Sequence, residues 1–386
     1  MANGRSASKI IGTLVTLIVI LFAVAAFFAF NFDEYAKYQY YKLTYKVTDD
    51  EDAKVFSECY SRTSGSVCVS MDIRVFTLFA FLEGVGGYDT EYGAVKSDSR
   101  LRLEADMASR LASVPSSRVS RWKRYFEEHP YNTYTYISYV LALGKPPQFK
   151  YIVPKSQIAG SEFFMLGGFR DILNDFFVTA QIDEVYAWHR DAGYFMPADK
   201  YDLAKMADQL SFANKYMRVE SAKAARIRLK IIPMPYESHY MGYSVTYGDD
   251  IYIIEGPGVF NGDLNWHEYV HSFINPAVKN TVWAYNVKFA KVLEENAKRP
   301  AVRGSYERLD SYVAENIVRA LDHKMQIAYA PSWAKDSLKR KLAETEKQEV
   351  LDGFVLIPFF SKELDSYATE SALEITSFVK KALASY

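Results

Sequence analysis

Five consecutive residues, His267-Glu268-Tyr269-Val270-His271, constrain this chain more than any other stretch, because their spacing has a chemical meaning only on an α-helix. Helical positions four apart differ by about 40° in azimuth and 6 Å in rise, so the two imidazoles can converge on one ion. Glu268 is turned by about 100° and can reach a water on that ion without being a ligand. The sequence therefore predicts a metal-binding helix, capped by Asp263 or Asn265. A surface helix that carries two histidines and no metal is the alternative.

A zinc site of this kind needs a third protein ligand and an open position for water. Glu315 lies in the apolar stretch SYVAENIVRAL, where a carboxylate is costly to bury unless a metal or a cation compensates it. We therefore expect Glu315 to be the third ligand. A pair with Arg319, four residues later on the same helix, is the alternative role for Glu315. Other candidate ligands are Glu294 and Glu295, in a stretch typical of an exposed helix end, and Glu307 and Asp310, in an expected loop or helix start.

The stretches HEYVHSFINP and YVAENIVRAL resemble an uncharacterised bacterial HExxH domain family and, more broadly, the gluzincin group of zinc metallopeptidases. The similarity runs loosely from about Asp72 to the C-terminus and is specific between about Asn265 and Leu321. The resemblance implies that His267, His271 and Glu315 are the zinc ligands. It also implies that Glu268 is the catalytic base. It also implies that the strands before the motif form a sheet whose edge receives an extended substrate. The chain departs from the best-known gluzincins in lacking an NExxSD-type stretch around its third ligand.

The expected activity is hydrolysis of peptide bonds in a peptide or protein substrate, with Zn²⁺ as the cofactor. Glu268 would remove the proton of a zinc-activated water as that water attacks a carbonyl. Hydrolysis of a non-peptide amide or ester is one alternative, and a non-catalytic envelope binding protein with an inert motif is another. The balance of 46 Lys and Arg against 47 Asp and Glu argues against a nucleic-acid partner.

Residues 10–30 form an apolar run of twenty-one residues without a charge, long enough as a helix to cross the roughly 30 Å core of a bilayer. Arg5 and Lys9 precede this run, and the first acid is Asp33. The positive-inside rule therefore predicts a single-pass cell-membrane protein with a cytosolic N-terminus and an extracytoplasmic catalytic domain. Secretion after signal-peptide cleavage is the alternative, since Ala23-Val24-Ala25 resembles a cleavage site.

The expected fold class is α+β: a mostly helical zincin-like domain with a small β-sheet before the HExxH helix, plus the N-terminal transmembrane helix. The strands are expected at 227–232 and in a hairpin of 242–247 and 251–254, around a Gly-Asp-Asp turn. Helices are expected from Met71 to about Gly84 and at 117–128, 134–143, 163–180 and 200–216.

The expected layout is a cytosolic N-terminus (1–9), a signal anchor (10–32), a stalk (33–69) and a catalytic domain (70–386), the last divided into a helical lobe (70–216) and a sheet and metal-site lobe (226–386). Cys59 and Cys68, the only cysteines, are expected to form a disulfide at the end of the stalk. Two unpaired thiols are the alternative.

Overall fold

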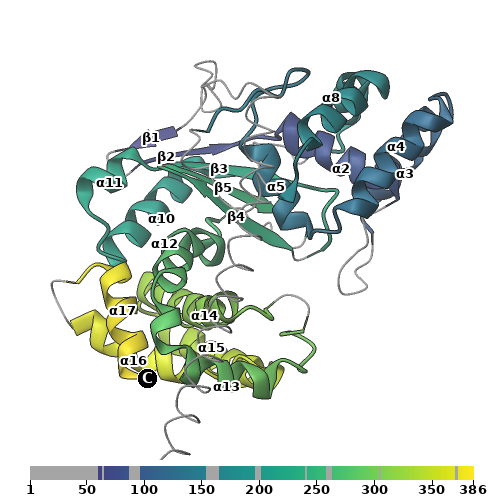
Figure 1. Cartoon of the computed structure of the whole chain (residues 1–386). Coiled ribbons are helices and arrows are strands. Elements are labelled where there is room, and N and C mark those ends of the chain that lie inside the picture. The colour runs from purple at the N-terminus through teal and green to yellow at the C-terminus, as the bar shows by residue number, and fades with distance from the viewer. Residues whose placement is uncertain are drawn as a thin grey trace, which may run out of the picture.

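In the part of the chain that the structure describes, five strands form one mixed sheet at the centre of the computed structural model (Figure 1). Their order across the sheet is β1-β2-β3-β5-β4, in which β2, β3 and β5 run parallel and the two outer strands run antiparallel to their neighbours. The strands are β1 (Tyr60–Arg62), β2 (Gly65–Val69), β3 (Arg228–Pro233), β4 (Gly242–Tyr247) and β5 (Asp250–Glu255). The structure describes residues 60–62, 65–86, 96–153, 165–195, 201–239, 241–257, 263–303, 306–369 and 373–386.

The predicted hairpin is confirmed: β4 and β5 pair from Gly242–Glu255 to Tyr247–Asp250, and Gly248 in the turn adopts a φ of 63° that suits glycine. The predicted strand before it is confirmed as β3. Residues 60–69, expected to end the stalk, instead provide β1 and β2 of the sheet. Cys68 is buried in β2 and is disulfide-bonded, and Cys59, its expected partner, lies outside the described residues.

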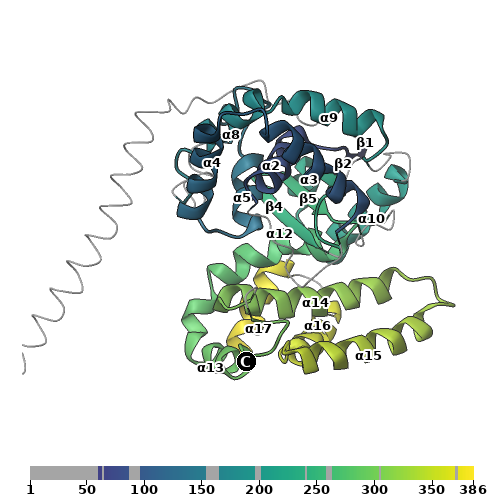
Figure 2. The same cartoon turned by 90° about the vertical axis from the view of Figure 1, so that its right-hand side faces the viewer.

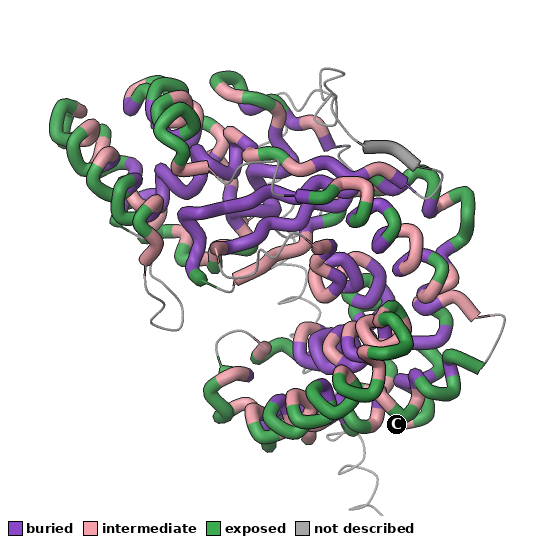
Figure 3. The backbone as a smooth tube through the Cα atoms, turned by 180° about the vertical axis from the view of Figure 1, so that it is seen from behind, coloured by how far each residue is buried: buried purple, intermediate pink, exposed green. Residues whose placement is uncertain are grey.

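The sheet separates two hydrophobic cores, because successive side chains of a strand face opposite sides. Ile251 and Ile253 of β5 lie in one core, and Tyr252 and Ile254 lie in the other. In Figure 3 the strands are mostly buried and the outer helices are exposed on one side.

The helices divide between these cores in chain order (Figures 1 and 2). The core that contains Tyr252 includes residues of α2 (Ile73–Val85), α3 (Asp98–Leu111), α4 (Ser116–Glu128), α5 (Thr133–Leu141), α8 (Phe169–Thr179) and α9 (Ile182–Asp191). The core that contains Ile251 includes residues of α10 (Leu203–Tyr216), α11 (Ser221–Arg226), α12 (Trp266–Lys279), η3 (Val282–Tyr285), α13 (Asn286–Asn296), α14 (Leu309–Tyr329), α16 (Ile357–Thr369) and α17 (Ile375–Ser385). The remaining helix, α15 (Lys335–Asp352), packs against α14 and α16.

Most of the predicted helices are confirmed with small shifts at their ends, as α2, α4, α5 and α10. The helix predicted at 163–180 is interrupted: α8 begins only at Phe169, because Gly168 before it takes a left-handed φ of 81° that a continuous helix does not allow. The mostly helical α+β class with a small sheet is therefore correct.

The predicted transmembrane anchor needs a correction. Residues 10–32 lie outside the described part of the chain, and none of the described helices is both long and apolar enough to cross a membrane. The longest of these helices, α14 and α15, have 21 and 18 residues, but charged side chains interrupt the apolar sequence of both. The transmembrane helix in the predicted fold class and the predicted single-pass membrane location are thus not supported.

Candidate metal centre

The HExxH motif lies in the first half of α12, as its spacing predicted. Asn265 precedes the helix, and its side-chain Oδ1 accepts a hydrogen bond from the backbone N–H of Glu268 at 3.2 Å. Such an N-cap satisfies one of the free N–H groups of the first turn. Tyr269 and Val270 are buried against the core, so the two histidines are left on a partly exposed face.

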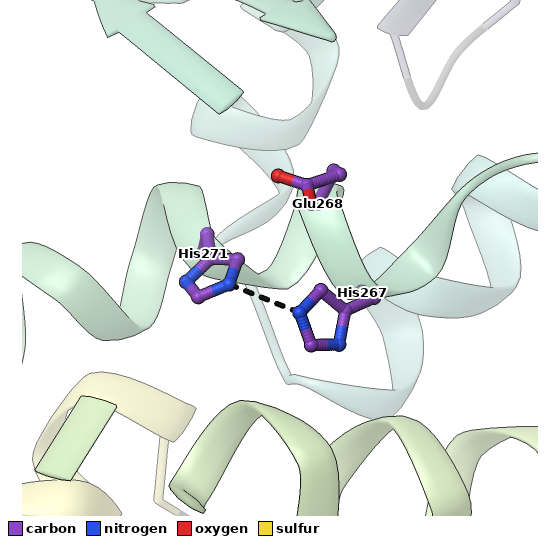
Figure 4. A group of neighbouring side chains, drawn as sticks. All are labelled: His267, Glu268 and His271. Carbon is purple, nitrogen blue, oxygen red and sulfur yellow. Dashed lines mark hydrogen bonds between the residues drawn. The ribbon is translucent and has the colours of Figure 1, made fainter. Parts of the chain in front are cut away.

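The two imidazoles point toward each other, with Nε2 of His267 3.2 Å from Nε2 of His271 (Figure 4). Glu315 approaches both rings from α14, the helix that packs most extensively on α12. Its Oε1 lies 3.5 Å from Nε2 of His267, and its Oε2 lies 3.3 Å from Nε2 of His271. Donors bound tetrahedrally to zinc at about 2.0–2.1 Å are spaced about 3.3–3.4 Å apart, so these three side chains fit a zinc ion.

Glu315 is only 1% exposed, yet neither of its carboxylate oxygens forms an aligned hydrogen bond with a described residue. Nε of Arg319 comes within 2.7 Å of Oε1 as an ion pair, without the alignment of a hydrogen bond. Burial alone would raise the pKa of Glu315, but the charges of Arg319 and His267 hold it well below its usual value. The carboxylate is thus ionised, and a cation between it and the imidazoles would compensate its buried charge.

The carboxylate of Glu315 also raises the pKa of His267. Burial alone would lower the pKa of this imidazole, but the negative charge of Glu315 outweighs burial and raises the pKa to about 9. A metal ligand must be the neutral imidazole. A proton and a metal cation therefore compete for His267.

Glu268 lies against the edge strand β4. A Cβ atom built on Gly242, the first residue of β4, would come within 2.9 Å of Oε1 of Glu268. Further along the same two elements, the hydroxyls of Ser244 and Ser272 are 3.0 Å apart. One ligand atom from each of His267, Glu268 and His271 lies within 4.8 Å of the others, so Glu268 is close enough to act on the same point in space. The absence of a side chain at position 242 makes this placement possible.

A second carboxylic acid, Glu255, lies near Glu268 and was not identified from the sequence. It ends β5, is 2% exposed, and pairs with Gly242, so its side chain is on the sheet face toward α12. Burial and the nearby charge of Glu268 raise the pKa of Glu255 to about 8. Glu255 therefore adds no full negative charge beside Glu268 at neutral pH.

The other acids considered as third ligands lie elsewhere. Glu294 and Glu295 are exposed on α13, and Glu307 is exposed before α14. Asp310 forms an ion pair with Arg308 at 3.0 Å. The structure thus brings Glu315 to the two histidines, and it also forms the Glu315–Arg319 pair that was the alternative. Both contacts coexist because Oε1 of Glu315 lies near both His267 and Arg319, while Oε2 lies near His271.

Comparison with known proteins gives one match. A sequence family described as a domain of unknown function (DUF4932) matches residues 148–367, a range that contains the motif helix, Glu315 and strands β3 to β5. No curated protein and no solved structure matches the chain.

Proposed function

We propose that this chain, which belongs to the DUF4932 family of unknown function, is a zinc metallopeptidase of the gluzincin type. The observation that carries the proposal is the convergence of His267, His271 and Glu315, with Nε2 and carboxylate oxygen atoms 3.2–3.5 Å apart. A buried carboxylate at the centre of this group, with neither oxygen in an aligned hydrogen bond to the described residues, supports a cation site rather than a chance meeting of two histidines.

The roles of the side chains follow from their positions. His267, His271 and Glu315 would hold the zinc, which when bound supplies Lewis acidity that acidifies water and polarises a carbonyl. Glu268 stands beside this point without taking part in the His–Glu–His group, and it would accept a proton from the attacking water. The same carboxylic acid would then donate that proton to the departing amine.

The edge strand β4 supports a peptide as the substrate. Gly256 donates its N–H to the carbonyl of Met241 at 2.8 Å, next to the Gly242–Glu255 pair. Because hydrogen-bonded residues alternate along an antiparallel ladder, the backbone groups of the even-numbered β4 residues point away from β5. These residues are Gly242, Ser244 and Thr246. An extended peptide could pair with this edge and so lie alongside Glu268 and the histidines.

The experiment compares the wild type with Glu268→Gln on a peptide library, with zinc content measured in both. Because Glu268 is assigned as the base and not as a ligand, the variant should retain zinc and lose about 10²- to 10⁴-fold in cleavage rate. Glu294→Gln, an exposed acid on α13, is the matched control and should cleave at the wild-type rate. Cleavage that persists unchanged in Glu268→Gln refutes the base assignment. A zinc-loaded wild type that cleaves no peptide refutes the peptide substrate.

A further inference from the structure

Arg319 contacts three groups at once, whereas an ordinary ion pair on a helix surface involves a single partner. Its Nε lies 2.7 Å from Oε1 of Glu315, and its Nη1 donates a hydrogen bond of 2.8 Å to Oε1 of Glu349 on α15. Its guanidinium carbon lies 4.2 Å from the centre of the Phe354 ring. Two of these three partners are 30 or more residues away in sequence, so the packing of α15 and the segment after it fixes Arg319.

We propose that Arg319 makes Glu315 a one-oxygen ligand, by holding Oε1 and leaving Oε2 for the metal. This inference rests on the proposed metal centre. The two oxygens are not equivalent: Oε1 has the guanidinium of Arg319 beside it and lies 3.5 Å from Nε2 of His267, whereas Oε2 lies 3.3 Å from Nε2 of His271 and pairs with no lysine or arginine of the described residues. A cation that approached Oε1 would meet the positive charge of Arg319 at close range.

Arg319 is itself held in place, so it can keep Oε1 of Glu315 away from the metal. Glu349 is buried and also lies 3.6 Å from Nε2 of His323, so it is itself fixed in place. A guanidinium between two carboxylates and an aromatic ring has few other positions to occupy. Arg319 is therefore a positioning residue that acts through Glu315. Restriction to one oxygen would keep a coordination position open for water, as a catalytic zinc site needs.

The test loads Co²⁺ into the full chain and measures its visible absorption, which weakens as the number of donors rises. In Arg319→Met the freed Oε1 becomes a fifth donor, and the absorption per bound Co²⁺ should fall by about half. Arg319→Lys keeps a positive charge near Oε1 and should retain the wild-type spectrum. The matched control is Lys324→Met, which removes a comparably buried cation from α14 that pairs with Asp365 and not with Glu315, and should also keep the wild-type spectrum.

An Arg319→Met spectrum equal to that of the wild type, at one Co²⁺ per chain, would overturn the inference and leave the metal centre intact. Failure of the wild type to bind Co²⁺ or Zn²⁺ would instead overturn the proposed function. If Arg319→Met does not fold, as circular dichroism would show, Glu349→Ala removes only the anchor of Arg319. It should give a smaller fall in absorption, and no change in that variant would equally count against the role of Arg319.

Discussion

Replacement of Gly242 by alanine should impair catalysis without touching a metal ligand. The added methyl would lie 2.9 Å from Oε1 of Glu268 and 3.2 Å from its Cδ and Cγ, whereas ordinary contacts begin near 3.4 Å. Because Gly242 does not adopt a left-handed φ, its backbone accepts alanine, and the strain falls on the Glu268 side chain.

The size of the effect follows from this overlap. To restore an ordinary contact, the carboxylate must move by about 0.5 Å, which is near the limit within which a catalytic group retains its function. A displacement of about 1 Å costs about 100-fold in rate, so half of it should cost about tenfold in kcat, or about 1.4 kcal/mol in the activation barrier.

The assay is kcat at saturating peptide, with zinc content and thermal unfolding measured on the same samples. Zinc content should remain at the wild-type value, and stability should be unchanged or slightly higher, since glycine weakens a strand. Ser244→Ala, two residues along the same face of β4, is the control and should keep kcat within about twofold because it removes only one hydroxyl contact. A Gly242→Ala variant with wild-type kcat would refute the placement of the base against β4.

Two further predictions concern the metal ligands. Glu315→Ala should lose zinc while the exposed Glu294→Ala retains it, as metal analysis of both would show, and the opposite result would move the third ligand to α13. The second concerns pH: burial alone would lower the pKa of His267, but Glu315 raises it from 6.5 to about 9. The metal-free chain should therefore hold on the order of 3 kcal/mol of stability that is fully present below pH 6.5 and lost as the pH rises to 9. Urea unfolding with and without chelator checks this. With zinc bound to His267 in place of the proton, the loss of stability between pH 6.5 and 9 should disappear. A metal-free stability that rises over this interval would contradict the prediction.

The parts of the fold that are encoded locally could be predicted from the sequence. The helix of the HExxH motif follows from a spacing of four residues, and the hairpin follows from a glycine turn between two apolar runs. Strand β2 could not be predicted in this way, because it is stabilised as a strand by pairing with β3, more than 150 residues later. Composition alone made the segment around Cys68 resemble a stalk.

The candidate site shows the same division between local and distant information. His267, Glu268 and His271 are fixed by one helix, whereas the choice of Glu315 among several acids depends on how α14 packs on α12. The contributions of Gly242, Glu255 and Glu349 depend on contacts between elements that are distant in sequence. No spacing or periodicity in the chain indicates such contacts.

The amount of zinc bound per chain tests the central claim most directly. Wild-type protein purified without chelator should contain about one zinc per chain, and His271→Ala, which removes one of three donors, should contain almost none. Less than about one-tenth of a zinc per wild-type chain, with no uptake when zinc is added, would contradict the account.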